Sequence, residues 1–352
     1  MRRRPVFVLL MVAALVPALS GCQPGGGTPA HSGTPGHVFV INLENQGYDR
    51  VFGSGSTMPY LAGVLRSQGV LLTNYYGIAH DSLPDYLAQI SGQMPNESTV
   101  KDCPTFSPFT QSGTDSQGRL LGSGCVYPAD VPTVAGQLTG AGKTWKGYME
   151  DLQSPCLHPA LGAPDDHRTA TPADQYSTHH NPFVYFRSVT DSPDCARDVV
   201  NYASLAHDLG SVATTPNLSY ITPNLCHDAH DSPCADGSTG GLRAADAWLK
   251  SQVPAILDSP AFKQDGMLII TLDEADSGRV GPSNAIPGGT AGGQVGALVL
   301  SPFSPQGGTS SQPYNHYSLL ASIEDFFSLP RLAVAGEPGV TAFGTDVYQA
   351  HA

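Results

Sequence analysis

A serine, a proline and a carboxylate stand close together between two structured segments of this 352-residue chain. They belong to the stretch His80-Asp81-Ser82-Leu83-Pro84-Asp85-Tyr86, with a predicted strand before it (70–76) and a predicted helix after it (85–91). Ser82 has the position of a helix N-cap, and proline is favoured in a first turn. A hydroxyl there faces free backbone N–H groups, which favour an alkoxide or a phosphate. The alternative is a serine that only caps the helix.

Carboxylates and an amide follow two other predicted strands. Glu44-Asn45 comes after the apolar run 37–43, and Asp273-Glu274 comes after the apolar run 266–272. A parallel sheet brings such strand ends to one edge, together with Ser82. Oxygen ligands of this kind suit one divalent ion, Ca²⁺, Mg²⁺ or Mn²⁺, and nearby histidines extend the choice to Zn²⁺ or Fe. Such an ion would favour the Ser82 alkoxide.

Three histidines complete this set: His180, His230 and His316. Imidazoles can bind phosphoryl oxygens or protonate a leaving group. The reaction that these residues indicate is displacement at phosphorus through a phosphoserine. For the pair His179-His180, the alternative is surface histidines beside a core segment.

The elements that must position these groups alternate between short apolar strands and helices. This order predicts an α/β fold, with a mostly parallel sheet and helices on both faces. Further strands are expected at 144–149, 218–222 and 295–300, and helices at 59–67, 131–139, 199–209, 240–257 and 318–327. A glycine-rich dinucleotide motif, a P-loop and a Gly-x-Ser-x-Gly elbow are absent from the sequence, which argues against a nucleotide-binding protein and an ordinary α/β-hydrolase.

The length of the chain suits one large domain or two modest ones, and we expect a single catalytic domain at 37–350 that does not bind nucleic acid. Apolar residues make up 40% of the chain, enough for a sizeable core, while 39 glycines and 30 prolines predict many loops. The net charge is −13, and no basic stripe is present. A strongly acidic chain repels phosphate backbones, so nucleic-acid binding is not expected.

The N-terminus reads as an export signal. Three arginines and an apolar run predict a signal peptide at 1–21. Leu19-Ser20-Gly21-Cys22 looks like a lipobox, so we expect a lipid on Cys22, a flexible tether at 22–36 and anchoring to the outer face of a membrane. A plain secretory signal, with release of the protein, is the alternative.

Six cysteines remain in the exported part, and an even number predicts disulfides. Their spacing gives neither a zinc ribbon nor a C-x-x-C redox pair. Sequential pairing is the simplest connectivity, and it would staple the loop regions 95–128 and 155–178. The expected pairs are Cys103–Cys125, Cys156–Cys195 and Cys226–Cys234.

Taken in order, these motifs resemble those of the bacterial phosphoesterase family of secreted acid phosphatases and phospholipases C. The similarity runs from about residue 37 to residue 348 and is greatest to the mycobacterial-type acid phosphatases that act on phosphoinositides. The motifs that carry it are Glu44-Asn45 with Tyr48, Ser82-x-Pro84-Asp85, His180-Asn181-Pro182-Phe183, Pro223-Asn224 with Asp228 and His230, Asp273-Glu274, and Asn315-His316-Tyr317-Ser318. The resemblance implies an alkaline-phosphatase-like α/β core with loop insertions.

The resemblance also implies a role for each matching residue. Ser82 becomes the nucleophile, with His180, His230 and His316 as catalytic partners. The implied metal ligands are Glu44, Asn45, Ser82, Asp273 and Glu274, and the implied substrate contacts are His80, Asp85, His180 and Asp228. Two positions depart from the pattern. Many relatives have Asn at Asp85, where a carboxylate would repel phosphate, and some have Asp at Glu274.

Among the family's activities, hydrolysis of phosphate monoesters, phosphoinositides included, is the expected one. The chain ends soon after the last expected helix, which leaves no room for the C-terminal domains of the phospholipases, and we expect a monomer. A phospholipase C-type phosphodiesterase remains an alternative, as does a sulfatase, although its signature is missing. An ester hydrolase using Ser82 and His316 without metal, and a binding lipoprotein without catalysis, also remain.

Overall fold

The computed structural model describes residues 33–116, 119–276 and 291–349. The expected signal peptide, the expected lipid attachment at Cys22 and most of the expected tether lie outside the described residues. They therefore stay predictions. Among the residues that the structure describes, no helix is both long and apolar enough to cross a membrane.

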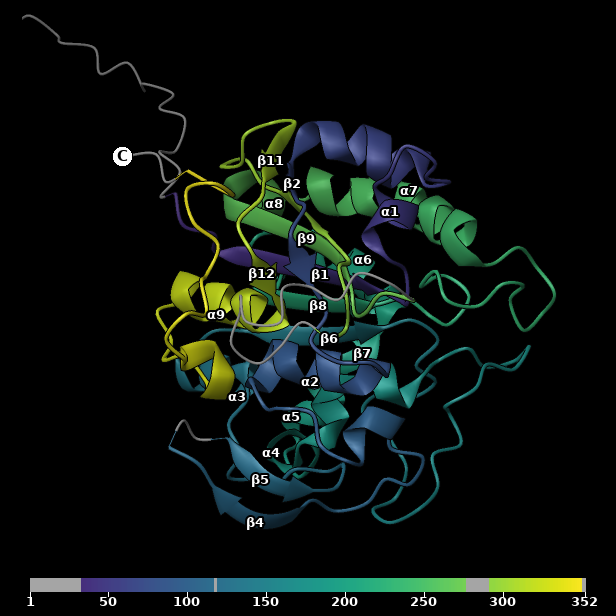
Figure 1. Cartoon of the computed structure of the whole chain (residues 1–352), viewed down its shortest axis with the longest axis vertical. Helices are drawn as coiled ribbons and strands as arrows, with labels where there is room; N and C mark the ends of the chain where they lie inside the picture. Colours follow the sequence, from purple (N-terminus) through teal and green to yellow (C-terminus); the bar gives the residue numbers. More distant parts are fainter. Residues whose placement is uncertain (1–32, 117–118, 277–290, 350–352) are drawn as a thin grey trace, which may run out of the picture. The chain divides into compact units, whose positions relative to one another are not determined.

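An eight-stranded sheet organises the described chain (Figure 1). Its strands are β1 (His37–Leu43), β2 (Val70–Leu72), β6 (Trp145–Met149), β7 (Val199–Asn201), β8 (Leu218–Thr222), β9 (Gly266–Leu272), β10 (Ala297–Leu300) and β11 (Gly308–Ser310). They follow the order β11-β2-β10-β9-β1-β8-β6-β7. All neighbours pair in parallel except β10, which runs antiparallel to both β9 and β2. The predicted mostly parallel α/β sheet is confirmed.

Helices pack around this sheet, and Figure 1 shows α7 and α8 grouped apart from α2, α3 and α9. The helices are α1 (Tyr48–Val51), α2 (Ser82–Ser91), α3 (Val134–Gly140), α4 (Arg187–Thr190), α5 (Asp194–Asp198), α6 (Leu205–Asp208), α7 (Gly241–Asp258), α8 (Pro260–Asp265) and α9 (His316–Phe326). Contacts join α2 to α9, and α8 to β1 and β9. The helix that carries Ser82 therefore packs against the helix that begins with His316.

The two central strands, β1 and β9, correspond to the two continuous apolar runs of the sequence, 37–43 and 266–272. Every residue of both strands is buried, because each strand has a neighbour on both sides and helices over the sheet. Alternation of polar and apolar residues is lost when both faces of a strand are covered. These two runs were predicted with the bounds that the structure has.

Two expected helices have a different form. Residues 199–209 form β7, a 3-10 turn at Tyr202–Ser204 and α6, because Val199 and its neighbours pair with β6. Residues 60–65 form a π-helix and residues 66–68 a 3-10 turn. The amide N–H groups of Tyr60 and Leu61 donate to the Asp246 carboxylate of α7, which ties the start of this π-helix to α7.

All three expected disulfides are present. The Cα atoms are 5.9 Å apart in Cys103–Cys125, 5.4 Å in Cys156–Cys195 and 4.9 Å in Cys226–Cys234. The first bond closes an insertion that carries a small hairpin of β4 (Thr110–Thr114) and β5 (Leu120–Ser123). A second small sheet pairs β3 (Tyr75–Tyr76) with β12 (Tyr314–Asn315), so the chain that approaches Ser82 lies beside the start of α9.

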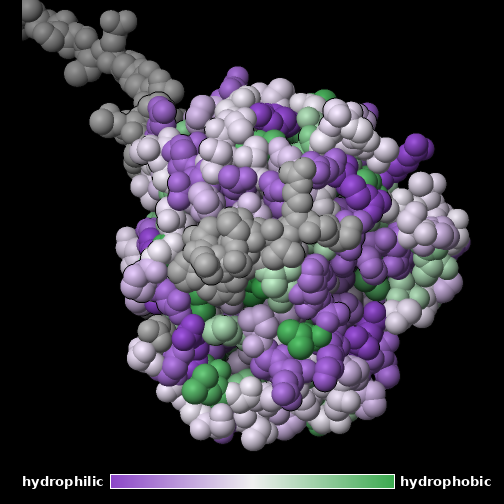
Figure 2. All heavy atoms as spheres, viewed as in Figure 1, coloured by the Kyte–Doolittle hydropathy of each residue, from purple (hydrophilic) through white to green (hydrophobic). Residues whose placement is uncertain are grey.

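The face of the molecule in Figure 2 is mainly hydrophilic, with hydrophobic residues in separate spots. The large apolar side chains that the described residues expose are spread along the chain: Val64, Met94, Leu121 and Leu161. Scattered exposed apolar residues are normal for a protein surrounded by water. The polar groups that could do chemistry are mostly buried instead, at one edge of the sheet.

Candidate active site

Glu44 and Asp273 lie side by side because they follow two neighbouring parallel strands. Leu43 of β1 is in register with Leu272 of β9, so the residues after them reach the same edge. The backbone N–H of Asn45 donates to Asp273 Oδ1 at 2.9 Å, and Asn45 Nδ2 donates to Glu44 Oε2 at 3.1 Å. The structure thus brings together three of the side chains expected to bind a metal.

Ser82 is the first residue of α2 and not its N-cap, so the helix begins earlier than the sequence indicated. The N-cap residue is Asp81, whose φ of 65° lies in the left-handed region and whose side chain makes no capping bond. The backbone N–H of Leu83 donates instead to Asp102 Oδ1 at 2.9 Å. A carboxylate from a distant loop therefore occupies part of the helix start that we expected to be free for a phosphate.

The Ser82 hydroxyl points at the buried carboxylate of Glu44. Its Oγ donates to Glu44 Oε2 at 2.9 Å, and the Tyr86 hydroxyl, one turn further along α2, donates to Glu44 Oε1. Ser82 is 4% exposed and Glu44 is fully buried. The expected nucleophile and an expected metal ligand are therefore in direct contact.

A cavity of about 330 Å³ opens onto this cluster. Its lining is mostly charged or polar and consists of Glu44, Asn45, Asp81, Ser82, Asp102, Arg168, Thr169, Ala170, His179, His180, Leu225, His230, Asp231 and Glu274. Six of the predicted site residues are in this lining: Glu44, Asn45, Ser82, His180, His230 and Glu274. The other five lie behind or beside it: His80, Asp85, Asp228, Asp273 and His316.

The two most deeply buried carboxylates of this cluster, Glu44 and Asp273, have no Lys or Arg partner among the described residues. Both residues are fully buried. Burial, and then repulsion from Asp273 and Asp228, raises the pKa of Glu44 well above its usual value. Burial likewise raises the pKa of Asp273 and, with repulsion from Asp273, that of Glu274 to about 10. Such a cluster must hold protons or a cation.

Two buried carboxylate oxygens without a hydrogen-bond partner among the described residues also indicate that the cluster holds protons or a cation. Asp273 Oδ2 and Asp228 Oδ2 are buried without a hydrogen-bond donor. No group of three or more His, Cys, Asp or Glu in the described ranges is already arranged as a metal site. The available oxygens are nevertheless of the type that Ca²⁺, Mg²⁺ or Mn²⁺ takes, from carboxylate, amide and hydroxyl groups. The donor set at Glu44, Asn45, Ser82, Asp273 and Glu274 therefore fits a hard divalent cation.

His180 sits between two of these carboxylates, Glu44 and Asp228. Its ring nitrogens lie 3.5 Å from Glu44 Oε1 and 3.6 Å from Asp228 Oδ2, and its ring stacks on Tyr86. Burial, followed by repulsion from His179 and His230, lowers the pKa of His180 well below its usual value. The alternative of surface histidines at this pair is wrong, because both rings are buried.

The other polar contacts of the site come from the loop after β8 and the corner before α2. Asp228 accepts the backbone N–H of Glu44 through its carbonyl oxygen at 2.7 Å, and accepts the N–H of His230 through Oδ1 at 2.9 Å. His230 itself is half exposed on the cavity wall, with Nδ1 3.2 Å from Asp231. His80 contacts the Glu274 carboxylate. This loop and this corner therefore meet around the strand-end carboxylates.

Asp85 and His316 lie behind the cavity lining and are fully buried. Asp85 Oδ1 accepts the N–H of Ile78 at 2.7 Å and lies 3.3 Å from His316 Nε2. His316 Nε2 donates to the carbonyl oxygen of Asp273 at 2.6 Å, and its Nδ1 accepts from the Tyr75 hydroxyl at 3.0 Å. These contacts hold the backbone of Asp273, and they place neither side chain on the cavity surface.

Eight lining residues received no role from the sequence, and five of them carry ionisable side chains: Asp81, Asp102, Arg168, His179 and Asp231. Asp102 and Arg168 belong to the two disulfide-stapled insertions, and no local pattern distinguishes them from other polar loop residues. Arg168 is the one Lys or Arg among the described residues that line this cavity. In the sequence, only the cysteine that directly follows Asp102 indicates that the position of Asp102 is fixed.

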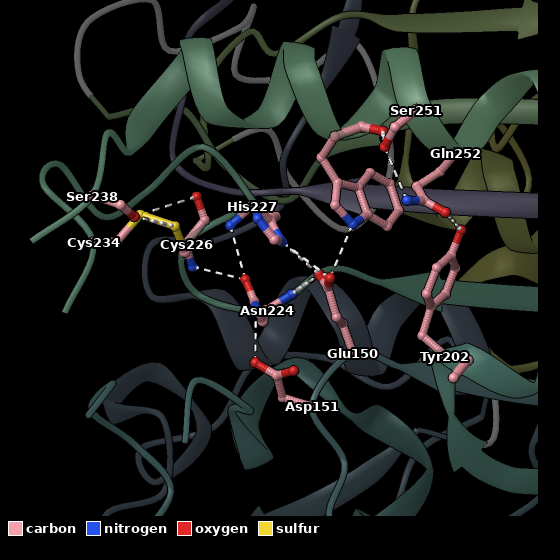
Figure 3. A network of polar contacts seen from close by, with 12 residues as sticks. Glu150, Asp151, Tyr202, Asn224, Cys226, His227, Cys234, Ser238, Ser251 and Gln252 are labelled. Carbon is pink, nitrogen blue, oxygen red and sulfur yellow. Dashed lines mark hydrogen bonds and ion pairs between the residues drawn. A yellow bond between two sulfur atoms is a disulfide. The ribbon is translucent and has the colours of Figure 1, made fainter. Parts of the chain in front are cut away.

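A second polar cluster surrounds Glu150 and residues of the loop after β8 (Figure 3). Glu150, at the end of β6, accepts the N–H of Asn224 at 2.9 Å and the indole N–H of Trp248 at 3.1 Å, while His227 Nδ1 lies 3.0 Å away. Asn224 Nδ2 also donates to Asp151 at 2.7 Å. Every oxygen of this glutamate has a donor, so its surroundings differ from those of Glu44.

Comparison with known proteins identifies relatives that match most of this chain. The model of the Phosphoesterase family matches residues 54–330. An acid phosphatase of Aspergillus fumigatus is 29% identical over 84% of this chain and 55% of its own length. A phosphatidylinositol-3-phosphatase of Mycobacterium tuberculosis is 26% identical over 96% of this chain and 92% of its own. The chain thus spans about half the length of the fungal relatives it matches.

Solved structures agree with the fold. A protein of the alkaline phosphatase superfamily from Vibrio parahaemolyticus superposes with a TM-score of 0.53 at 12% identity, over 89% of this chain and 70% of that one. At this identity the similarity concerns the fold alone. It confirms the expected alkaline-phosphatase-like α/β core.

Proposed function

Because the chain belongs to the phosphoesterase family, we propose that it is an exported, metal-dependent acid phosphatase that hydrolyses phosphate monoesters through a phosphoserine on Ser82. One observation carries the proposal. The Ser82 hydroxyl stands at a helix start on the cavity wall, 2.9 Å from the buried Glu44 carboxylate and among oxygens without compensating charge. The acid phosphatase names of several relatives support the reaction class.

In the first half of the reaction, the Ser82 hydroxyl releases its proton to solvent, its Oγ attacks the phosphorus, and the ester P–O bond breaks. The alcohol leaves with a proton, for which His230, half exposed on the cavity wall, is a candidate donor. In the second half, water attacks the phosphoserine and releases inorganic phosphate and free Ser82. His180, held between Glu44 and Asp228, is placed to orient the phosphoryl oxygens.

Glu44, Asn45, Asp273 and Glu274, with the Ser82 oxygen, would hold one divalent cation. When bound, such an ion stabilises the deprotonated hydroxyl and the negative charge of the phosphoryl group. The chain itself brings the buried carboxylates of Glu44 and Asp273 together, because β1 and β9 end in register. Metal analysis of the purified protein would identify the ion among Ca²⁺, Mg²⁺, Mn²⁺, Zn²⁺ and Fe.

For the substrate, we propose phosphate monoesters that include phosphoinositides, by analogy with the mycobacterial relative. We also propose that Cys22 carries a lipid that anchors a monomer to the outer face of the membrane. Labelling with radioactive palmitate tests the anchor, since Cys22→Ala should lose all label. Equal labelling of both proteins would contradict it.

The central test is turnover of p-nitrophenyl phosphate and of its choline phosphodiester analogue by purified wild type and Ser82→Ala, with metal analysis of both proteins. Ser82→Ala should lower kcat by several orders of magnitude, roughly 10³-fold or more, as other nucleophile deletions do. Acid quenching with labelled substrate should trap phosphate on the peptide that contains Ser82.

Other results would change the proposal in defined ways. Faster hydrolysis of the choline diester would favour a phospholipase C-type phosphodiesterase. Label on His180 or His230 would replace the phosphoserine with a phosphohistidine. If neither ester is hydrolysed, with or without added metal, the result would favour a binding lipoprotein without catalysis.

A further inference from the structure

We propose that Asp102, a residue of the first disulfide-stapled insertion, is a positioning residue that sets the orientation of the Ser82 hydroxyl. The inference rests on the proposed role of Ser82 as nucleophile. Asp102 lies in the same cavity wall as Ser82 and reaches it from a segment that forms no part of the strand–helix corner. Its carboxylate acts on the backbone of α2, and not on the reacting atoms.

The contact is a helix cap supplied from outside the helix. The first residues of a helix have N–H groups without an intrahelical partner, and a nearby carboxylate oxygen can accept them. Here the residue before the helix, Asp81, does not do so. Asp102 Oδ1 accepts the N–H of Leu83 at 2.9 Å, and the N–H of Ser82 also interacts with the Asp102 carboxylate.

The corner needs such a restraint because its backbone is strained. Asp81 has φ 65° and ψ 142°, a conformation that a residue with a side chain seldom adopts. Strain of this kind persists only where neighbouring contacts impose it. The direction of the next side chain, Ser82, depends on that peptide, and its Oγ must reach Glu44 Oε2 at 2.9 Å.

Asp102 is itself fixed by its own loop. Its backbone N–H donates to the carbonyl of Thr99 at 3.0 Å, and the N–H of Cys103 donates to that of Ser98 at 3.2 Å. The Cys103–Cys125 disulfide follows directly and is buried. The Cys103–Cys125 disulfide thus holds Asp102 in place, which gives the insertion a function at the active site.

A competing role is electrostatic, because Asp102 faces several charged or titratable groups. Arg168 and His230 lie near its carboxylate, and Asp81 also lies close. A cap needs only an oxygen acceptor, whereas a charge role needs the carboxylate. Two substitutions separate these possibilities, since Asn keeps the acceptor without the charge and Gly removes both. Both tolerate the φ of 51° at this position.

The experiment compares Asp102→Asn and Asp102→Gly with wild type in kcat, KM, bound metal and circular dichroism, using p-nitrophenyl phosphate. Asp102→Gly should lower kcat by about 10–100-fold, the usual cost of a small misplacement of a catalytic group. Its KM and metal content should stay within about twofold of wild type. Asp102→Asn should keep kcat within about threefold, since Asn and Asp are similar caps.

Three results would overturn the proposal: wild-type kcat in Asp102→Gly, an Asp102→Asn variant as inactive as the glycine variant, or loss of metal from either. If Asp102→Gly does not fold, the activity of Asp102→Asn still decides between cap and charge. Ser82→Ala is assayed in parallel. Activity retained there would refute the nucleophile itself, so the two failures are distinguishable.

Discussion

Glu44 and Glu150 are two glutamates that directly follow parallel strands of the same sheet, yet their surroundings differ. Glu150 accepts from two N–H groups and lies beside His227, whose imidazolium can balance its charge. Glu44 receives hydroxyl and amide donors, but its charged neighbours are further carboxylates, and burial lowers the pKa of His180 beside it. Both sit where an α/β sheet places ligands.

The difference separates a structural cluster from a binding cluster. A buried carboxylate costs free energy unless protons, hydrogen-bond donors or a counter-ion compensate it. At Glu150 the chain provides that compensation itself. Around Glu44, the described residues leave Asp273 Oδ2 and Asp228 Oδ2 without donors, and a bound cation, as proposed above, would supply the missing charge. Strand-end position alone therefore does not identify a catalytic carboxylate.

The largest effect should follow from Asp273→Asn, which preserves shape and removes one charge of the uncompensated cluster. We expect kcat to fall by about 10²–10³-fold, as when other electrostatic groups of a site are removed, and bound metal to fall to background. With chelator present, the variant should melt at least about 2 °C above chelated wild type, since one buried charge is gone. A chelated variant less stable than chelated wild type would contradict this reading.

Glu150→Gln is the matched change on the compensated side. It should lower the free energy of unfolding by about 1–3 kcal/mol, because the partners of the carboxylate lose a charged acceptor. Metal content and kcat should stay within about threefold of wild type. Chemical denaturation and p-nitrophenyl phosphate turnover check both points. Unchanged stability together with a large loss of kcat would make the Glu150 cluster part of the catalytic machinery.

The smallest effect concerns His227, whose pKa its hydrogen bond to Glu150 raises. Because the folded state holds this proton more tightly, the stabilisation is complete below the unfolded pKa of about 6.5 and is lost as pH rises through the folded pKa. Asp151 and Asp236 also face the ring and act in the same direction.

His227→Gln should therefore destabilise more at about pH 5.5 than at about pH 9. The difference should stay below about 1 kcal/mol, since the ring is partly exposed and its ion pair is screened. Urea denaturation at the two pH values measures it. An equal loss at both would show that charge plays no part in this contact.

Features that depend on neighbours in the sequence could be predicted from it. The purely apolar runs of β1 and β9, the polar pairs after them and the sequential disulfides needed only burial, strand order and short separation. The conformation of 199–209 could not be predicted, because pairing of Val199 with Gly147 of β6 overrides the local helical pattern. The start of α2 could not be predicted either, because the N–H of Leu83 donates to Asp102, a residue of another loop.

The sequence by itself determined which residue types stand at the strand ends: Glu44-Asn45, Asp273-Glu274 and the Ser82 corner. Only the tertiary structure decided which of them share one cavity, that Asp85 and His316 stand behind it, and that Asp102 and Arg168 enter its wall. The physical reason is that register and hydrogen bonding order residues along a strand, whereas burial and charge compensation depend on segments far apart in the chain. Glu44 and Glu150 look alike in sequence, and their different partners distinguish them.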